Sequence, residues 1–177
     1  MKPHANPPAQ HIVARILQSR REQTGSHAAQ SSVTLITGTP IQTQNGALAV
    51  ETLTAGDQLI TRTQGLTPLS KIRKSRAMMH AVRFTAGSLG HTQPGGDLLL
   101  PLNQQVLIRD WRAKAMFGQP QAVVPAFELI DEEFIRDEGM KMLELCTLTF
   151  DRPHVIYAGG MEIATSRAAG DNLRPAA

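Results

Sequence analysis

Residues 34–61 read TLITGTPIQTQNGALAVETLTAGDQLIT, a run in which short apolar alternations are separated by pairs of turn-forming residues. The alternation before position 44 is typical of a strand, and Asn45-Gly46 predicts a type I′ turn because both residues tolerate positive φ. A second short strand follows the turn. Gly56-Asp57 then indicates another turn before a third strand over 58–61. The stretch therefore predicts a compact β unit.

The rest of the chain continues this pattern of short strands and frequent turns. The polar, basic residues 61–76 predict a solvated hairpin or loop, and the acidic residues 127–142 predict either a short helix or a loop between strands. Further strands are expected around Val82 and Phe84, over 98–102 and 106–109 as a pair, and over 143–150. Residues 154–157 and 161–165 are expected as strands joined by a hairpin turn at Gly159-Gly160. Because no long helical pattern occurs among them, the sequence predicts an all-β fold.

The 177 residues suffice for one domain with a substantial core. We expect residues 1–32 to be a flexible segment, residues 33–166 the folded domain and residues 167–177 a disordered tail. Apolar residues at helical spacing predict a short, basic, amphipathic helix over 10–23. Such a helix can dock on its own domain, or it can bind a membrane or a partner.

Composition excludes several classes of function. The net charge of +3 is mild, and aromatic residues make up only 4% of the chain, so the charge pattern does not predict nucleic-acid binding. No apolar run is long enough for a membrane span, and the N-terminal residues lack the apolar core of a signal peptide. We therefore expect a cytoplasmic protein or one exported without such a signal. The lone Cys146 excludes an internal disulfide.

Two blocks within the opening stretch carry a family resemblance. The first is Gly38-Thr39-x-Ile41-x-Thr43-x-x-Gly46, and the second is Val50-Glu51-x-Leu53-x-x-Gly56-Asp57-x-Leu59-x-Thr61. Together they resemble the start of a Hint (Hedgehog/intein) domain, and more narrowly the bacterial stand-alone Hint-type domains. Further blocks of the same subfamily follow in order within residues 82–90, 97–107, 116–118 and 123–129. The resemblance implies a horseshoe-like β fold with pseudo-twofold symmetry.

The resemblance also implies a chemistry, in which the first residue of the domain attacks the preceding carbonyl and the domain cleaves or rearranges its own backbone. That reaction needs an activated nucleophile, donors for an oxyanion and an acid for the leaving amine. At the positions where the family carries its nucleophilic Cys and its mid-domain His, this chain has Thr34 and Gln104. Where family members often carry two later His residues, it has Thr147 and Pro153.

These departures make the reactive positions vestigial. His154 and Cys146 each lie one residue away from such a position and are not expected to replace it, because adjacent strand residues face opposite sides. We expect a protein that has lost autoprocessing and acts as a structural or binding module with an unknown protein partner. The alternative is a Hint autoprotease that slowly cleaves itself before Thr34. No cofactor is expected, nor a metal, since the His residues are scattered.

Overall fold

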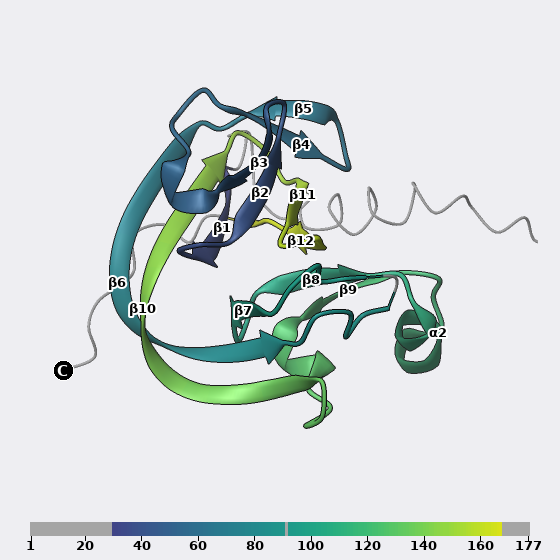
Figure 1. Ribbon diagram of the computed structural model, residues 1–177. Coiled ribbons are helices and arrows are strands. Elements are labelled where there is room, and N and C mark those ends of the chain that lie inside the picture. Colours follow the sequence, from purple (N-terminus) through teal and green to yellow (C-terminus); the bar gives the residue numbers. More distant parts are fainter. Residues whose placement is uncertain (1–29, 91, 168–177) are drawn as a thin grey trace, which may run out of the picture.

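The computed structural model describes residues 30–90 and 92–167 (Figure 1). The described residues form short strands and two long ones, together with two 3₁₀ turns and one short helix. In chain order these are β1 (Ser31–Ile36), β2 (Pro40–Thr43), β3 (Gly46–Ala49), η1 (Val50–Thr52), β4 (Gln58–Thr61), β5 (Gly65–Pro68), β6 (Lys71–Phe84), β7 (Leu98–Pro101), β8 (Gln105–Ile108), α2 (Trp111–Phe117), β9 (Ala122–Pro125), η2 (Ala126–Leu129), β10 (Ile135–Phe150), β11 (Val155–Ala158), β12 (Met161–Ala164) and β13 (Ser166–Arg167). The all-β class predicted from the sequence is confirmed. The expected helix over 10–23 lies outside the described residues.

Two long antiparallel strands, β6 and β10, form a curved ribbon that gives the molecule its horseshoe-like outline (Figure 1). One sheet has the order β13-β1-β10-β6-β7, and the other has the order β3-β2-β4-β11-β12-β8-β9, with β5 paired to β4. Each long strand gains a further partner at its C-terminal end. β1 pairs with residues 145–150 of β10, and β7 pairs with residues 81–84 of β6. This reciprocal arrangement is the pseudo-twofold relation that the resemblance implies.

The two long strands are where the sequence-based expectation fails. Residues 71–76, expected in a solvated hairpin or loop, are the first half of β6, and residues 135–142, expected in a helix or loop, are the first half of β10. Most side chains in these halves are exposed or only half buried, so no apolar alternation marks them. Their strand conformation is instead stabilised by the backbone ladder between the two strands.

Two smaller predictions are also corrected. A type I′ turn at Asn45-Gly46 is wrong, because only Gly46 has positive φ (96°) and that turn requires two such residues. The strands β7 and β8, expected as a pair, belong to different sheets: β7 pairs with β6, whereas β8 pairs with β9 and β12. Helix α2 was not expected. It is capped by Asp110, whose side chain accepts from the Arg112 N–H.

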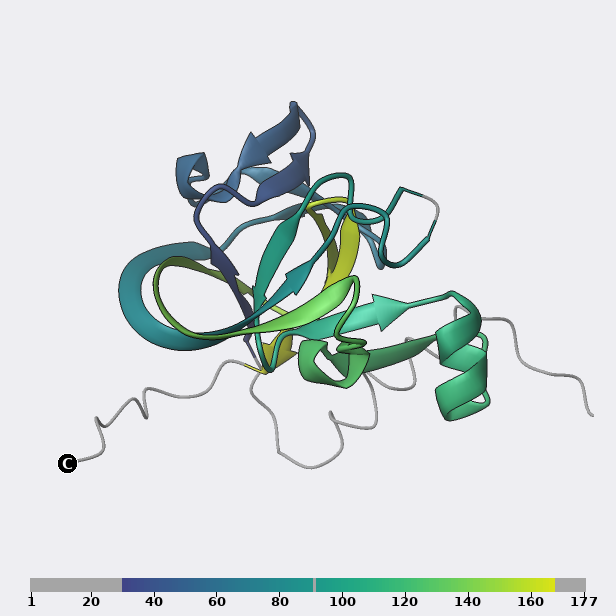
Figure 2. The same ribbon diagram turned by 60° about the horizontal axis from the view of Figure 1, so that its bottom comes forward.

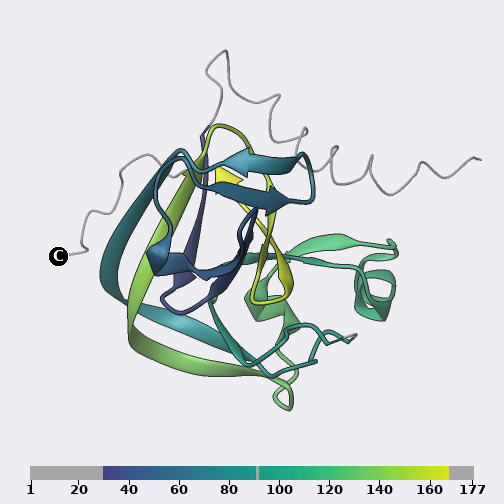
Figure 3. The same ribbon diagram turned by 45° about the horizontal axis from the view of Figure 1, so that its top comes forward.

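The hairpins lie in two groups beyond the ribbon. Figure 3 brings forward the β4–β5 hairpin and the neighbouring β2–β3 hairpin, which follow β1 in the chain. Figure 2 shows the second group, in which α2 connects β8 to β9 at the end of that hairpin. The β11–β12 hairpin links the groups, because β11 pairs with β2 and β4 while β12 pairs with β8.

The motif residues of the opening stretch shape turns of the backbone. Gly38 has a φ of 88°, which strongly favours glycine, and its N–H donates to the Glu51 carboxylate at 2.7 Å. That hydrogen bond lowers the pKa of Glu51. Thr39 donates to the Ile36 carbonyl at 2.7 Å, and Asp57 accepts from the Thr54 N–H at 2.7 Å. The motif therefore fixes turns rather than reacting groups.

One main core fills the space between the two sheets, and a smaller cluster lies on the other face of the ribbon. The small cluster combines Ala81, Leu143 and Leu145 with the half-buried Ile36, Ala77, Met79 and Leu99. The largest fully buried side chains of the molecule are Phe84, Phe150, Leu35, Ile41, Leu59, Leu69, Leu100, Ile135, Leu148, Ile156, Met161 and Ile163. They come from both sheets, so the two groups of hairpins share a core.

The tight β11–β12 turn predicts a large effect of a small substitution. A Cβ at Gly159 would lie 2.7 Å from Leu98 Cδ2, whereas a Cβ at Gly46 would meet nothing within 4 Å, although both glycines have positive φ. Gly159→Ala should therefore lower the free energy of unfolding by about 1–3 kcal/mol more than Gly46→Ala, because only the first adds overpacking to backbone strain. Denaturant unfolding of both variants tests this, and equal losses would contradict the packing.

Candidate functional site

The position of the family nucleophile lies in the middle of β1. Thr34 pairs with Thr147 on β10, and the two side-chain oxygens are 2.9 Å apart, so one hydroxyl donates to the other. Both side chains are half buried. The structure thus brings together two of the three predicted positions, and it joins them as a hydroxyl pair. Neither hydroxyl is a base near neutral pH.

The backbone around the bond before Thr34 belongs to a regular ladder. The Thr37 N–H donates to the Glu144 carbonyl at 3.0 Å, and the same register continues along β1. Since hydrogen-bonded and non-hydrogen-bonded pairs alternate in antiparallel strands, Val33 and Leu148 form a hydrogen-bonded pair and Thr34 and Thr147 do not. The Val33 carbonyl oxygen therefore faces the N–H of Leu148.

Gln104, at the position of the mid-domain His, lies between β7 and β8. Its side-chain amide donates to the Gln105 carbonyl at 3.2 Å and to the Ala164 carbonyl at 3.1 Å. The described contacts of Gln104 include no hydrogen bond to Thr34 or Thr147. The amide thus satisfies backbone acceptors of Gln105 and of Ala164 on β12.

His154 follows the end of β10, and its described side-chain contacts are with Phe150 and Thr63 rather than with the hydroxyl pair. It is almost fully buried, packs edge-on against Phe150 with ring centroids 5.6 Å apart, and its Nδ1 lies 2.9 Å from the Thr63 hydroxyl. Burial and the nearby Arg152 lower the pKa of His154, so its neutral form is favoured. The ring therefore acts as a core group hydrogen-bonded to Thr63.

Cys146 is the neighbour of Thr147 on the opposite face of β10. Its side chain is part of the main core, and burial raises the pKa of its thiol. Because the thiolate is the nucleophilic form, this environment makes Cys146 unreactive. The structure agrees with the interpretation of Cys146 as a core residue.

Sequence reasoning missed a buried polar network beside β1. The Ser31 hydroxyl donates to the Arg152 carbonyl at 2.5 Å and accepts from the Thr165 hydroxyl at 3.1 Å. Thr165 in turn accepts from the His154 N–H at 2.9 Å. These hydrogen bonds join the first strand to the end of the domain. Ser31 and Thr165 are 134 residues apart in the chain. No local pattern could have indicated them.

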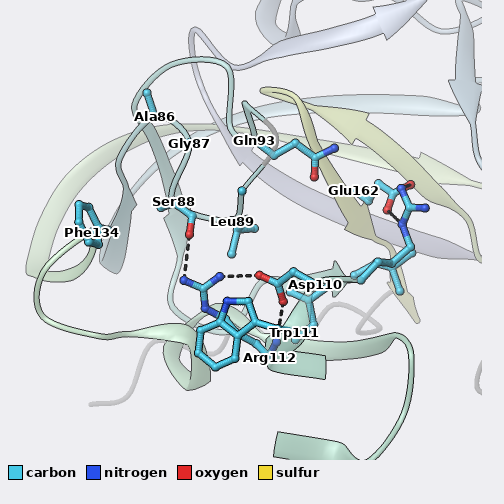
Figure 4. Close-up of a pocket in the computed structure, with 14 residues that line it drawn as sticks. Ala86, Gly87, Ser88, Leu89, Gln93, Asp110, Trp111, Arg112, Phe134 and Glu162 are labelled. Atoms are coloured by element: carbon cyan, nitrogen blue, oxygen red, sulfur yellow. Dashed lines mark hydrogen bonds and ion pairs between the residues drawn. The ribbon is translucent and has the colours of Figure 1, made fainter. Parts of the chain in front are cut away.

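A pocket of about 680 Å³ lies away from the hydroxyl pair, between the loop after β6, the β8–α2 junction and β12 (Figure 4). None of Thr34, Gln104 and Thr147 lines it. Trp111, which is 70% exposed, and Phe134 supply aromatic surface at the pocket, and the Arg112 guanidinium lies 5.1 Å from the Trp111 ring centroid. Arg112 also pairs with Asp110 at 2.5 Å. The pocket thus combines aromatic surface with charged groups.

A buried carboxylate lies at one side of this pocket. The Glu162 side chain is only 3% exposed and accepts from Arg109 Nε at 2.7 Å and from Arg62 Nη1 at 2.8 Å. A second Arg109 nitrogen contributes a bond of 3.1 Å, so that pair is bidentate. Arg62 lies between β4 and β5, and Arg109 directly follows β8. We call Arg62, Arg109 and Glu162 the Glu162 triad, and it links the two groups of hairpins at β12.

Two classes of feature are missing from the part of the chain that the structure describes. Residues 30–90 and 92–167 contain no group of three or more His, Cys, Asp or Glu side chains that could hold a metal ion. Among the same residues, no helix has the length and apolar character needed to cross a membrane.

The triad predicts a loss of stability when its carboxylate is removed. Glu162→Ala should lower the free energy of unfolding by about 1–3 kcal/mol, since both guanidinium groups would lose a charged hydrogen-bond partner while staying partly shielded from water. Glu144→Ala is the matched control, because Glu144 is exposed and its side chain makes no ion pair among the described residues; its effect should stay within about 0.5 kcal/mol. Equal effects in denaturant unfolding would contradict a structural role for the triad.

The environment of His154 predicts a pH dependence. Its folded-state pKa is lower than the ordinary value of 6.5, so the unfolded chain binds a proton more readily than the native protein. The contribution of neutral His154 to the free energy of unfolding is fully present above the pKa of the unfolded chain. It is lost as pH falls from about 6.5 toward the pKa of His154 in the folded protein. The free energy of unfolding should therefore decrease less steeply between pH 6.5 and 5 in His154→Asn than in the wild type. Parallel pH profiles would contradict this.

Comparisons with known proteins identify the family of the chain. The model of the family described as "Hint domain" matches residues 33–168, and no curated protein matches the chain. Among solved structures, the bacterial intein-like domain from Clostridium thermocellum is 14% identical, with a TM-score of 0.48, covering 75% of this chain and 98% of its own. The gp41-1 intein is 10% identical, with a TM-score of 0.45, and the match covers 74% of this chain and 98% of the intein. With the family match spanning most of its length, the chain belongs to the Hint domain family.

Proposed function

We propose that this Hint domain has lost self-processing and serves as a structural or binding module. The observation that carries the proposal is the pairing of the Thr34 and Thr147 hydroxyls at 2.9 Å. An alcohol is a weak nucleophile unless a neighbouring base removes its proton. Among the residues that the structure describes, the side chain hydrogen-bonded to Thr34 is another alcohol, which is not a base near neutral pH.

The acid side of the reaction supports the same proposal. A departing backbone amine must receive a proton, which requires a group that titrates near the working pH. The Gln104 amide does not titrate, and its hydrogens already bind two carbonyl oxygens. His154 could titrate, but it is buried against Phe150 and bound to Thr63 instead. Among residues 30–90 and 92–167, the contacts of Gln104 and His154 thus supply neither an acid nor a base to Thr34.

The binding part of the proposal is supported by the pocket at the β8–α2 junction. Its aromatic side chains, Trp111 and Phe134, are 70% and 49% exposed. Exposed aromatic groups beside charged ones are typical of surfaces that bind protein partners. This pocket is separate from the hydroxyl pair, so binding there does not require the family's chemistry.

One observation favours the alternative of slow cleavage before Thr34. The Val33 carbonyl oxygen faces the Leu148 N–H in the ladder, and a fixed N–H donor can stabilise an oxyanion that develops on that oxygen. A scaffold with this donor but without acid and base would react slowly. The two functions therefore predict different behaviour when the missing groups are restored.

Restoring the reactive side chains tests the proposal. The double variant Thr34→Cys with Gln104→His should cleave between residues 33 and 34, and Thr34→Cys alone should cleave more slowly because it still lacks the acid. Intact-mass spectrometry over several days at neutral pH with a strong thiol measures the fragment. Wild-type protein that cleaves as fast as the double variant would contradict the loss of self-processing.

The matched control places the thiol elsewhere. Thr37→Cys with Gln104→His puts a cysteine directly after β1, where it lies beyond the Thr34–Thr147 pair. This control should show no cleavage before residue 34. If it cleaves like the double variant, the reaction does not depend on the Thr34 position.

A further inference from the structure

Three methionines and a histidine lie together on one face of the β6–β10 ribbon. Met78 is directly opposite Met142, and His80 is directly opposite Met140. Because side chains two residues apart on a strand point to the same face, the two pairs are neighbours on one face. We call Met78, His80, Met140 and Met142 the Met/His quartet. The opposite face at this point carries the small apolar cluster that includes Ala77, Met79 and Leu143.

The backbone pattern places the members of each pair close together. The His80 carbonyl accepts from the Leu102 N–H at 2.9 Å, so the backbone polar groups of His80 point toward β7. His80–Met140 and Met78–Met142 are therefore non-hydrogen-bonded pairs of the ladder between β6 and β10. Such pairs have Cα atoms about 4.5 Å apart, with successive pairs about 7 Å apart along the strand. Methionine, with three rotatable bonds, can bring its sulfur across this spacing.

The three thioethers of the quartet are not used in the core. Met78 is 51% exposed, Met140 58% and Met142 51%. A polar residue would be the usual choice at such solvent-facing strand positions. Each sulfur retains its lone pairs as soft ligands, and none contributes to a buried cluster. The exposure of the thioethers therefore leaves them accessible to a ligand.

The imidazole of the quartet is oriented by a carboxylate. His80 Nε2 is hydrogen-bonded to Asp137 Oδ1, and that oxygen also accepts from the Gly139 N–H at 2.7 Å. An ionised carboxylate only accepts, so Nε2 carries the proton and Nδ1 of the neutral ring keeps a lone pair. A carboxylate on the far nitrogen is the usual outer partner of a histidine that ligates a metal.

We propose that the Met/His quartet binds a soft monovalent metal ion, Cu(I), through the Met78, Met140 and Met142 sulfurs and His80 Nδ1. Thioether and imidazole ligands select Cu(I) over Mg²⁺ or Ca²⁺, which prefer oxygen. The quartet contains neither a thiolate nor a carboxylate ligand, which disfavours a structural zinc site. The sequence predicted no metal site because its histidines are scattered. That prediction did not include methionine sulfurs as ligands.

Methionine-methyl NMR of the full-length protein tests the site directly. The chain has seven methionines, and ¹³C-methyl labelling resolves them as separate probes. Titration with Ag(I), which has the same charge and ligand preference as Cu(I), should shift the methyl signals of Met78, Met140 and Met142 first. The Met116 signal should stay in place at the same Ag(I) concentration. Shifts in none of the three quartet methyls, or equal shifts at Met116, would overturn the proposal.

Affinity measurements with matched variants complete the test. Met78→Leu and Met142→Leu conserve volume, so the fold should persist, and each should weaken Cu(I) binding in anaerobic competition with bicinchoninate. Met116→Leu removes an equally exposed thioether on α2 (50%) and should leave the affinity unchanged. Asp137→Asn should weaken binding about 10- to 100-fold by releasing His80. Equal affinities for the Met142→Leu and Met116→Leu variants would overturn the site, as would a wild type without measurable binding.

Discussion

The pairing of β6 with β10 is the interaction on which the rest of the structure depends. These strands run antiparallel from Lys71 to Phe84 and from Ile135 to Phe150, with a bulge between Asp137 and Gly139. One end of the ribbon carries β1 and the other carries β7. Since the β2–β5 hairpins follow β1 and the β8–β9 hairpin follows β7, the ribbon sets where both groups of hairpins pack. Loss of this ladder would separate the halves of the shared core.

The residues of the family motif and the residues at the proposed vestigial positions have different roles in this scaffold. Gly38, Glu51 and Asp57 each make a hydrogen bond or adopt a backbone angle that shapes a turn of the fold. Thr34 and Thr147 instead form one pair within a ladder that the backbone already holds in register. Replacement of a nucleophile at such a position removes chemistry without removing a structural contact. The fold is therefore compatible with the proposed loss of self-processing.

Much of the fold could be predicted from the sequence because its signals are local. Alternating residues and Gly-Gly turns marked the β11–β12 hairpin, where Gly159 and Gly160 both have positive φ. The first halves of β6 and β10 could not be recognised, since their exposed side chains show no alternation between a buried and a solvent face. Helix α2 was missed because its seven residues are too few for a helical period.

The part of the candidate site that depends on local sequence signals could also be predicted. The Thr34 and Thr147 positions follow from ordered motifs, and the strand register brings them together. The Glu162 triad depends on Arg62, which is 100 residues away in the chain, and only the folded topology joins them. The Met/His quartet likewise depends on the register between two strands whose first halves carry no clear strand signal.

The intact mass of the wild-type protein tests the central claim most directly. Freshly purified protein is incubated for days at neutral pH with hydroxylamine, which captures any ester formed at Thr34, and is then weighed by mass spectrometry. A catalytically silent Hint scaffold predicts an unchanged mass of 19.2 kDa. Loss of the mass of residues 1–33, leaving a chain that begins at Thr34, would contradict the account and show that self-processing survives.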